Sequence, residues 1–507
     1  MNNKIYRDLF IFITISWFLV HGIRSTFDFA VHDGISFYTL EKWQIFYFLS
    51  LSRYTEALFM FINNGSEPII NSILSIIFLF GISVLLKKLF KLNNLKTIIV
   101  AFVFIANPYV GGYYGVYRNV DTYFLYMFCI THSIFLITSN YKINTITIFL
   151  SSLLLMIAIG VTAVSIQYFF GLLILTIILD YDRIASPFSI IIKAVAVFTC
   201  ACTLHIILSK CLTNFIGINI DTKSYNGIGS LFIFKDFSII NAIKNTYIDF
   251  WNHYNYSTLF LNKITRYLAI GCLFISIVIA GLNIYIKKGK ISFSYFMFLV
   301  ITFPFFANCT YWLTNGVTAP HMKWFNILLY TFATIVIINE IEKHESFIKY
   351  ITSYITVIFL IAIIFGNILW CNKFYRILNT SFENTKLQYS NILNDISNFI
   401  GNRKINDFNI VFVGNLNFNS NVKYTYNNNW LYDLEHVSGW NNLTFATTYS
   451  GTEQKFIKEF LLREINQLRD NSRINYEVID TINQYPNNGY ILQQDNILFI
   501  KLSDKTT

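Results

Sequence analysis

The sequence carries little charge for its length. Only 13% of its 507 residues are Asp, Glu, Lys or Arg, whereas 54% are hydrophobic and 18% are aromatic. Soluble domains contain about 25% charged residues, because their surfaces must be solvated. The composition therefore excludes an ordinary soluble protein and predicts a polytopic membrane protein.

Several signatures of soluble enzymes are also missing. The chain has no HExxH zinc motif, no Walker phosphate loop and no GxSxG nucleophile turn. Its seven cysteines lie in or beside apolar segments without metal-ligand spacing, so we expect neither a disulfide framework nor a bound metal. The net charge of +10 comes from short basic runs beside apolar segments, a pattern that sets membrane topology. We expect no nucleic-acid partner.

Apolar segments long enough to cross a bilayer recur along the chain. The continuous segment 146–179 would be about 50 Å long as one helix, which is too long for one crossing, so we divide it at residues 160–167. The pattern then predicts eleven spans, at residues 9–23, 68–86, 97–106, 123–137, 146–160, 167–179, 189–208, 264–286, 292–306, 325–338 and 350–369.

Basic clusters predict the orientation of these spans. Lysines and arginines collect before the first span, after the second and between the eighth and ninth: Lys4, Arg7, Lys87, Lys88, Lys91, Lys96, Lys287, Lys288 and Lys290. Such clusters stay in the cytoplasm. We therefore expect a cytoplasmic N-terminus, a periplasmic C-terminus and a location in the bacterial inner membrane. The residues after the first span do not resemble a signal-peptide cleavage site, so we expect that span to be retained.

The connecting loops define the predicted domains. The fold class is an all-α polytopic membrane bundle at residues 1–369, with outer loops at 24–67, 107–121, 209–263 and 307–323. Loop 24–67 includes an amphipathic pattern, with Leu40, Trp43, Phe46, Tyr47 and Leu51 at helical spacing, which predicts a helix on the outer membrane surface. Loop 107–121 is so rich in glycine and tyrosine that we do not expect a simple helix there.

Residues 370–507 are polar and asparagine-rich, which predicts a small α+β periplasmic domain. Helical periodicity occurs at 385–400 and 453–470, and strand patterns occur at 408–414 and 476–480. Residues 490–502 resemble a hairpin.

Acidic and basic side chains gather in the outer loops: Asp28, His32, Asp33, Arg118, Asp121, Lys223, His321 and Lys323. A carboxylate there can take a proton from an attacking hydroxyl, and a basic group can hold a phosphate. Two structural alternatives remain. Arg118 and Asp121 can simply pair at a helix start, and Lys323 can extend to the membrane interface.

Two further polar residues have more than one interpretation. Gln167 can bond a sugar hydroxyl inside the bundle or bond a neighbouring helix. Glu56 can belong to a site or be a charge on a helix surface.

The order of several short motifs resembles the bacterial and phage serotype-converting O-antigen glucosyltransferases. The likeness begins with VHDG, then SRYTEALFMFINNG and EP before the second span. It continues in NPY, VYRNVD, SIQY, APHM, CNKFY and NIVFVG. The motifs are individually short, but together they extend over most of the chain.

This resemblance implies a GT-C-like fold and a transfer of glucose from undecaprenyl-phosphate-glucose to an O-antigen sugar at the periplasmic face. It implies dependence on a flippase and on a lipid-glucose synthase. It requires no cofactor, although a divalent metal is compatible with the chemistry.

The resemblance also suggests residue roles. Asp33 is our candidate for the base, Asp121 orients the acceptor or shares that role, and Asp28 is a third acid. Many relatives have Asp-Asp where this chain has His32-Asp33, and many have glycine where it has Ser52. We expect basic and polar groups to bind substrate. Arg53, Arg118 and Lys223 are expected at the donor phosphate, and Gln167 and His321 at other parts of the substrate.

Two other functions compete with the transferase. A transporter or flippase for a lipid-linked sugar should carry charged residues at mid-membrane depth, whereas here they lie in the loops. An O-antigen polymerase should have a large outer loop late in the chain, which residues 209–263 match only weakly.

Overall fold

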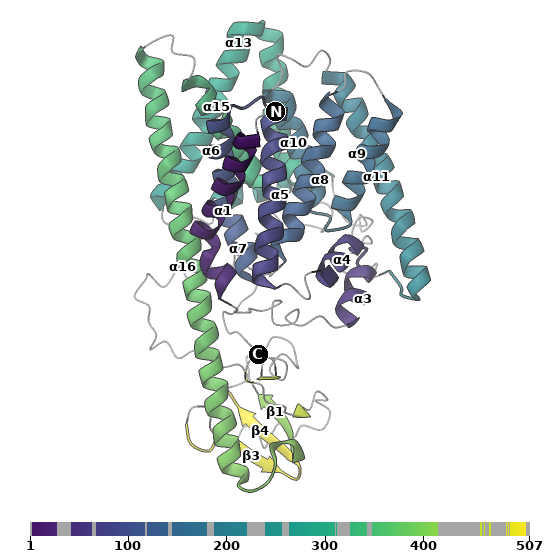
Figure 1. The fold of residues 1–507 in the computed structure, drawn as a ribbon, viewed down its shortest axis with the longest axis vertical. Helices are drawn as coiled ribbons and strands as arrows, with labels where there is room; N and C mark the ends of the chain where they lie inside the picture. Colours follow the sequence, from purple (N-terminus) through teal and green to yellow (C-terminus); the bar gives the residue numbers. More distant parts are fainter. Residues whose placement is uncertain are drawn as a thin grey trace. The chain divides into compact units, whose positions relative to one another are not determined.

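The computed structural model describes most of the chain (Figure 1). The described residues are 3–27, 42–62, 67–116, 119–139, 144–179, 187–220, 239–255, 263–309, 311, 325–341, 347–413, 457–458, 461, 466–467, 483, 485 and 487–502. They form two compact units, the first reaching Phe374 and the second beginning at Tyr375.

The first unit consists of helices. Their bounds are α1 Asn3–Thr26, α3 Lys42–Ser50, α4 Tyr54–Ile62, α5 Pro68–Leu89, α6 Asn94–Ile105, α7 Pro108–Val116, α8 Val120–Ser139, α9 Thr145–Ile159, α10 Ser165–Leu179, α11 Pro187–Ile216, α12 Ile239–Asn255, α13 Lys263–Ala307, α15 Phe325–Ile341 and the first part of α16 Phe347–Ile400.

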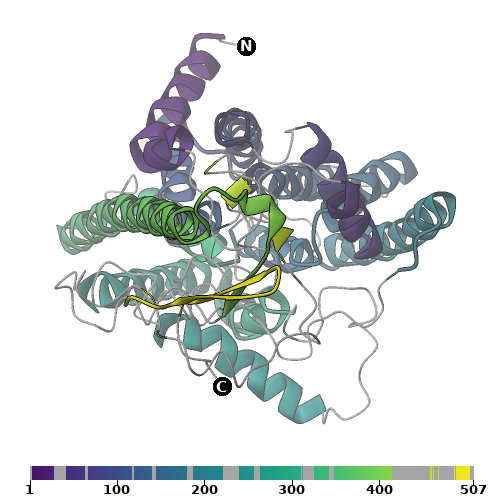
Figure 2. The same ribbon diagram turned by 90° about the horizontal axis from the view of Figure 1, so that it is seen from below.

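This unit is an all-α membrane protein. Six of the described helices are long and apolar enough to cross a membrane, or seven if α6 and α7, which meet at 44°, count as one broken span. Three shorter apolar helices lie in α9, α10 and α15. Large side chains fill the interior between the helices, including Trp17, Phe124 and Tyr168, all with an exposed fraction of 0%. The helices lie side by side in Figure 2.

The apolar segments predicted from the sequence coincide with these helices. Segment 146–179 is divided as predicted, because α9 ends at Ile159 and α10 begins at Ser165. Helix α13 consists of two arms that reverse direction at Gly289, whose φ of 81° is left-handed. The arms pack closely, since a Cβ on Gly281 would lie 3.0 Å from the Phe296 ring. The basic cluster predicted between two spans occupies this reversal.

Two predictions about helix positions were wrong. Residues Pro108–Val116 form a helix, α7, although we expected none there. Its start is favourable because Pro108 occupies the first turn and the Asn107 side chain accepts a hydrogen bond from the Tyr109 backbone amide at 3.0 Å. Helix α11 also continues to Ile216, eight residues beyond the predicted end, so it covers the start of the predicted loop 209–263.

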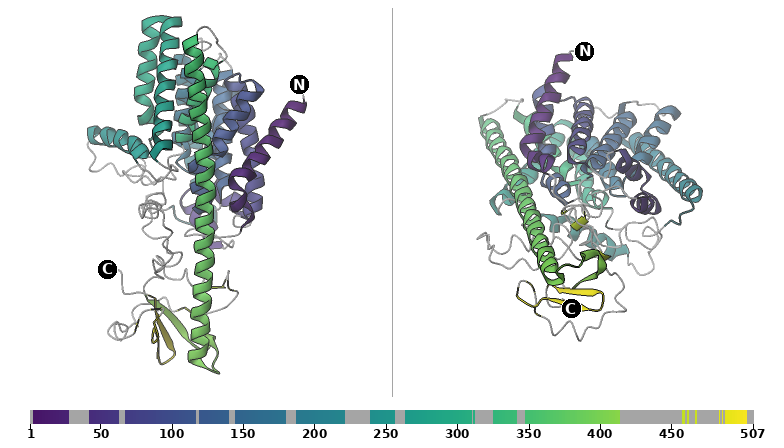
Figure 3. Two further views of the ribbon diagram at one scale, coloured as in Figure 1. Left: turned by 90° about the vertical axis from the view of Figure 1, so that its left-hand side faces the viewer. Right: turned by 60° about the horizontal axis from the view of Figure 1, so that its bottom comes forward.

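The predicted helix in the first loop forms as α3. Gln44, Phe48 and Leu51 are buried, whereas Phe46 and Tyr47 are 45% and 42% exposed. A second amphipathic helix, α12, lies across the direction of the long helices (Figure 3). It contacts the end of α13, where Asn308 Nδ2 donates to the Thr246 carbonyl at 3.1 Å.

The second unit contains the later part of α16 and a four-stranded sheet. The strands are β1 Asn409–Val413, β2 Asn466–Gln467, β3 Ile491–Gln494 and β4 Ile497–Lys501, in the order β2-β1-β4-β3. β1 is parallel to both neighbours, and β3 and β4 form an antiparallel hairpin. Apolar residues of α16 and the sheet are fully buried, among them Ile396, Ile410 and Leu498.

The predicted helix 385–400, strand 408–414 and hairpin 490–502 are therefore present in the second unit. The predicted domain start at residue 370 falls inside the continuous helix α16. The predicted span 350–369 and the predicted helix 385–400 are therefore parts of one helix. Residues Asn466–Gln467 form a strand, although we expected them in a helix. The predicted strand 476–480 lies outside the described residues.

Candidate functional site

The chemically distinctive part of the first unit lies at one end of its helices. There α1 and α9 end, α5, α8 and α10 begin, and the short helices α4 and α7 pack between them. We call this the α4 end.

Helix α4 is held by the last turn of α9. The Thr55 backbone amide donates to the Gly160 carbonyl at 3.0 Å. The Tyr54 hydroxyl donates to the Met156 carbonyl and the Thr55 hydroxyl to the Ile157 carbonyl, both at 3.0 Å. The last carbonyls of a helix have no partner within it, and the first amides of a helix have none either. Each helix end therefore satisfies the other, and the two dipoles align head to tail.

Two backbone positions permit this arrangement. At Gly160 a Cβ would lie 2.5 Å from the Tyr54 ring and 2.6 Å from the Thr55 hydroxyl, so only glycine allows the approach. Ser52, between α3 and α4, has a left-handed φ of 62°. That conformation favours glycine.

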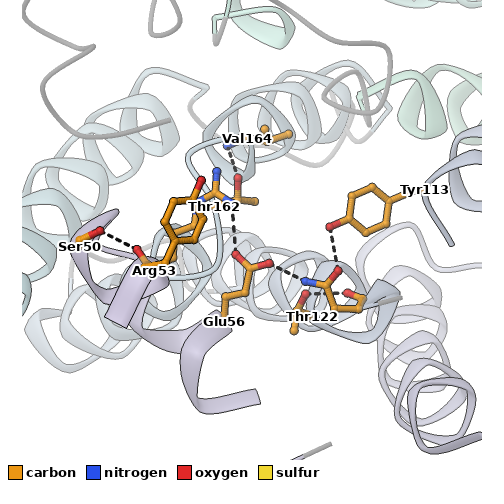
Figure 4. A network of polar contacts seen from close by, with 9 residues as sticks. Ser50, Arg53, Glu56, Tyr113, Thr122, Thr162 and Val164 are labelled. Carbon is orange, nitrogen blue, oxygen red and sulfur yellow. Dashed lines mark hydrogen bonds and ion pairs between the residues drawn. The ribbon is translucent and has the colours of Figure 1, made fainter. Parts of the chain in front are cut away.

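The partly buried Arg53 and the buried Glu56 and Asn119 form a network that we call the carboxylate cluster (Figure 4). Arg53 Nη1 lies 3.3 Å from Glu56 Oε2, and the Asn119 amide donates to Glu56 Oε1. The Tyr113 hydroxyl donates to Asn119 Oδ1 at 3.2 Å. The Glu56 residue is only 3% exposed. The cluster joins the start of α4 to the segment between α7 and α8.

Burial changes the protonation behaviour of this pair. Desolvation raises the pKa of Glu56 above its ordinary value of 4.5, although Arg53 and the hydrogen bond from Asn119 lower it in part. For Arg53, burial lowers the pKa, but Glu56 and the neighbouring tyrosines outweigh that effect and raise it. Arg53 is therefore a permanent cation, and Glu56 is a carboxyl group that can exchange a proton closer to neutral pH.

Tyrosines line the path from the carboxylate cluster into the bundle. The Tyr113 and Tyr123 rings lie 4.0 Å apart, and Tyr123 lies 5.1 Å from Tyr126. All three are at most 5% exposed. The Tyr123 hydroxyl also bonds Tyr113 and Thr162, and its ring experiences the charges of Arg53 and Glu56. The cluster is thus bordered by aromatic faces that carry polar hydroxyl groups.

A second buried network, the Arg24 cluster, lies at the same end. Arg24 Nε donates to the Tyr114 carbonyl at 2.8 Å, and the guanidinium lies 5.4 Å from the Tyr114 ring. The Tyr114 hydroxyl is 2.7 Å from Ser72 Oγ, which lies 2.8 Å from Ser25 Oγ. Both Arg24 and Asp121 interact electrostatically with Tyr114. Because Tyr113 and Tyr114 are consecutive in α7, this helix contributes to both clusters.

The structure describes three of the residues predicted to form a site. Arg53 belongs to the carboxylate cluster, Asp121 is fully buried in the first turn of α8 near the Arg24 cluster, and Gln167 is fully buried in the first turn of α10. The other five predicted residues lie outside the described part of the chain: Asp28, Asp33, Arg118, Lys223 and His321.

Sequence reasoning missed several members of these clusters. Asn119, Tyr113 and Tyr114 were within a segment taken as a loop, and Arg24 was taken as the first residue of a loop. For Glu56, the surface interpretation is wrong, because the residue is buried. A useful signal was the three-residue spacing of Arg53 and Glu56, which places both charges on one helical face.

Among the described residues, no group of three or more His, Cys, Asp or Glu side chains is positioned to hold a metal ion. No protein-family model, curated protein or solved structure matches the chain. The site's chemistry therefore has to be argued from its own geometry.

Proposed function

We propose that this protein is a membrane glycosyltransferase that uses a lipid-phosphate-linked sugar. Its donor is undecaprenyl-phosphate-glucose, and its acceptor is a sugar of the lipopolysaccharide O-antigen at the periplasmic face. The observation that carries the proposal is the ion pair of Arg53 with the buried Glu56, beside three tyrosines at one end of an apolar bundle. The donor has a lipid tail, a charged phosphate and a sugar. The apolar bundle suits the lipid tail, Arg53 suits the phosphate, and the tyrosines suit the sugar.

The proposed reaction needs a base and a group that stabilises the leaving phosphate. The acceptor hydroxyl attacks the anomeric carbon, the bond to the phosphate oxygen breaks, and the lipid phosphate leaves with the bonding electrons. A carboxylate takes the hydroxyl proton, and basic groups bind the phosphate. We assign the base to Asp33, which follows α1 nine residues after Arg24, and the phosphate contact to Arg53. Asp121 supports the acceptor side.

Glu56 has a supporting role in this mechanism. It holds Arg53 in place with an ion pair of 3.3 Å and is itself held by Asn119. Charge-assisted bonds of this kind orient a guanidinium for bidentate phosphate binding. The roles of Arg118, Lys223 and His321 stay as predicted from the sequence.

We further propose eleven crossings, counting α6, α9, α10, α15 and both arms of α13 as separate spans. The α9, α10 and α15 segments are short, but their mutual packing and apolar composition support this count. The basic groups Lys87, Lys88 and Lys288 lie at the end opposite to α4, which supports a cytoplasmic assignment for that end. The α4 end and the C-terminal α+β unit are then periplasmic.

A flippase or an O-antigen polymerase remains a competing proposal. A flippase needs charged or polar groups along a path through the bilayer. The buried charges of both clusters instead lie in the first or last turns of their helices. This location favours a reaction at one membrane face.

The proposal is tested with purified protein in lipid vesicles, supplied with O-antigen acceptor. Transfer is expected with undecaprenyl-phosphate-glucose and not with UDP-glucose alone, because the proposed mechanism requires a lipid phosphate at Arg53. Transfer from UDP-glucose without lipid would refute the donor assignment. Movement of the lipid-linked sugar across the bilayer without transfer would favour the flippase.

A further inference from the structure

Gln167 is fully buried, and its side-chain amide has no hydrogen-bond partner. The residue lies in the first turn of α10, and neither Nε2 nor Oε1 bonds another group among the described residues. A buried amide loses its bonds to water, so leaving it unpaired destabilises the fold. Native proteins rarely retain such a group unless a bound molecule completes it.

Three further buried polar atoms that have no partner among the described residues lie near the same helix end. They are the Tyr126 hydroxyl on α8, the Ser165 hydroxyl at the start of α10, and Asn308 Oδ1 directly after α13. We call these three residues and Gln167 the amide cluster.

The contacts of the neighbouring residues bring these atoms to one level of the bundle. The Tyr126 ring lies 6.3 Å from the ring of Tyr168, the residue after Gln167. At Gly171, three residues after Tyr168 in α10, a Cβ would lie 3.7 Å from the Ala307 methyl, and Asn308 follows Ala307. Gln167 is one turn before Gly171 on the same helical face.

The chemistry of the amide cluster selects a neutral ligand with many hydroxyl groups. Gln167 offers both a donor and an acceptor, Asn308 offers an acceptor, and the two hydroxyls can do either. A phosphate has only acceptors at neutral pH and would leave both amide oxygens unpaired. A hydrocarbon tail would leave all of these groups unpaired. Sugar hydroxyls can donate and accept, so they satisfy the whole set.

The amide cluster is next to the carboxylate cluster. Tyr126 belongs to the row of neighbouring rings that begins at Tyr113, whose hydroxyl bonds Asn119. We infer that the amide cluster binds the glucose ring of the donor while the phosphate stays near Arg53. This inference rests on the proposed function and adds a sugar-binding subsite deeper in the bundle.

The variant Gln167→Leu tests whether the Gln167 amide binds a ligand or stabilises the fold. Leucine has a similar size and no polar atoms, so the ligand-free variant is expected to unfold at the same temperature as the wild type or about 2 °C higher. Thr176→Val on the same helix is the matched control, because its buried hydroxyl donates to the Leu172 carbonyl at 2.7 Å. Thr176→Val removes a paired group and shows the loss of stability expected for a structural bond. A similar clear loss in ligand-free Gln167→Leu would mean that the Gln167 amide makes a structural bond and would overturn the inference.

Binding is then measured in detergent with two probes, a short-chain polyprenyl phosphate and the same lipid phosphate carrying glucose. The wild type is expected to bind the glucosylated lipid more tightly, and Gln167→Leu is expected to lose about tenfold in that affinity while still binding the bare phosphate normally. Equal affinity of wild type and Gln167→Leu for the glucosylated lipid would mean that only water occupies the subsite, and would overturn the inference. If neither lipid binds the wild type, the proposed function itself fails.

Discussion

The two ends of the helical bundle differ in the charges that they bury. At the α4 end, Arg24 and the carboxylates of Glu56 and Asp121 are buried, with Arg24 donating to the Tyr114 carbonyl and Glu56 accepting from Asn119. At the other end the buried charged residues are lysines, Lys96 and Lys193, while Lys88 and Lys288 are exposed. Lysines at this end fix orientation, whereas buried carboxylates are expensive and persist where they are used. The comparison supports the proposal that the α4 end is the functional face.

The largest expected effect concerns orientation. A reporter enzyme that is active only in the periplasm should work when fused after Ile216, where α11 leaves the α4 end, and should fail when fused after Leu89, beside Lys87 and Lys88. Reporter activity in intact cells, normalised to the amount of fusion protein, is the measurement. Activity after Leu89 would place the charged clusters in the cytoplasm and contradict the proposed reaction.

The next test removes a carboxylate from each end. Asp33→Asn should reduce O-antigen glucosylation by about 10² to 10⁴-fold, since asparagine cannot accept the hydroxyl proton. Asp8→Asn at the other end removes only an exposed carboxylate 3.1 Å from Arg7 and should leave activity unchanged. Asp28→Asn should have a smaller effect than Asp33→Asn. Normal glucosylation by Asp33→Asn, at normal membrane levels, would move the base to Asp121 or Asp28.

Stability should separate buried from exposed ion pairs. Glu56→Gln leaves the partly buried Arg53 without its counter-charge and should cost about 2–3 kcal/mol of unfolding free energy, whereas Asp8→Asn should cost less than about 0.5 kcal/mol. Denaturant unfolding in detergent micelles gives both values. An equal effect of the two variants would remove the distinction between the ends.

The same variant has a signature in pH. Because burial raises the pKa of Glu56 above 4.5, the folded protein keeps this proton to higher pH than the unfolded chain does. The stability contribution of this group therefore falls as the pH rises from about 4.5 through the raised pKa. Glu56→Gln should lack that decline. The measurement is the unfolding temperature of both proteins across this pH range, and a decline that persists in Glu56→Gln would contradict the assignment to Glu56.

Gly160→Ala should detach α4 without removing a charge. The added methyl would overlap Tyr54 and Thr55, so we expect a loss of about 1–3 kcal/mol together with reduced activity. Gly271→Ala in α13 is the control, since nothing lies within 4 Å of its added methyl and alanine favours a helix. Unchanged activity in Gly160→Ala would show that the position of α4 is not needed.

The smallest effect is expected at Ser52. Replacement by glycine relieves the left-handed backbone and removes a buried hydroxyl without a partner, so Ser52→Gly should stabilise by about 0.5–1 kcal/mol. Ser50→Gly, two residues earlier in helical backbone, should destabilise by a similar amount. If both glycine variants destabilise, Ser52 is not strained.

The sequence predicted the apolar helices better than it predicted the site. Apolar runs and glycines carry local information, so the division between α9 and α10 and the hairpin of β3 and β4 could be read directly. The α7 helix was missed because its glycines weaken local helix propensity, while tertiary packing, such as the close approach of Gly111 to Cys371, stabilises it. Partners such as Asn119 and Glu56 are 63 residues apart, and no local pattern specifies such a pair.

The docking of α4 on α9 also sets an order of events during biosynthesis. The hydrogen bonds from Tyr54 and Thr55 reach carbonyls that are 102 residues later in the chain. A ribosome that adds about 5–20 residues per second makes that stretch in about 5–20 s. Until then the growing protein has an α4 segment with a charged pair and no place to bury it. The α4 end is consequently among the last parts of this half of the bundle to assemble, so a chain interrupted before α9 is complete leaves α4 undocked.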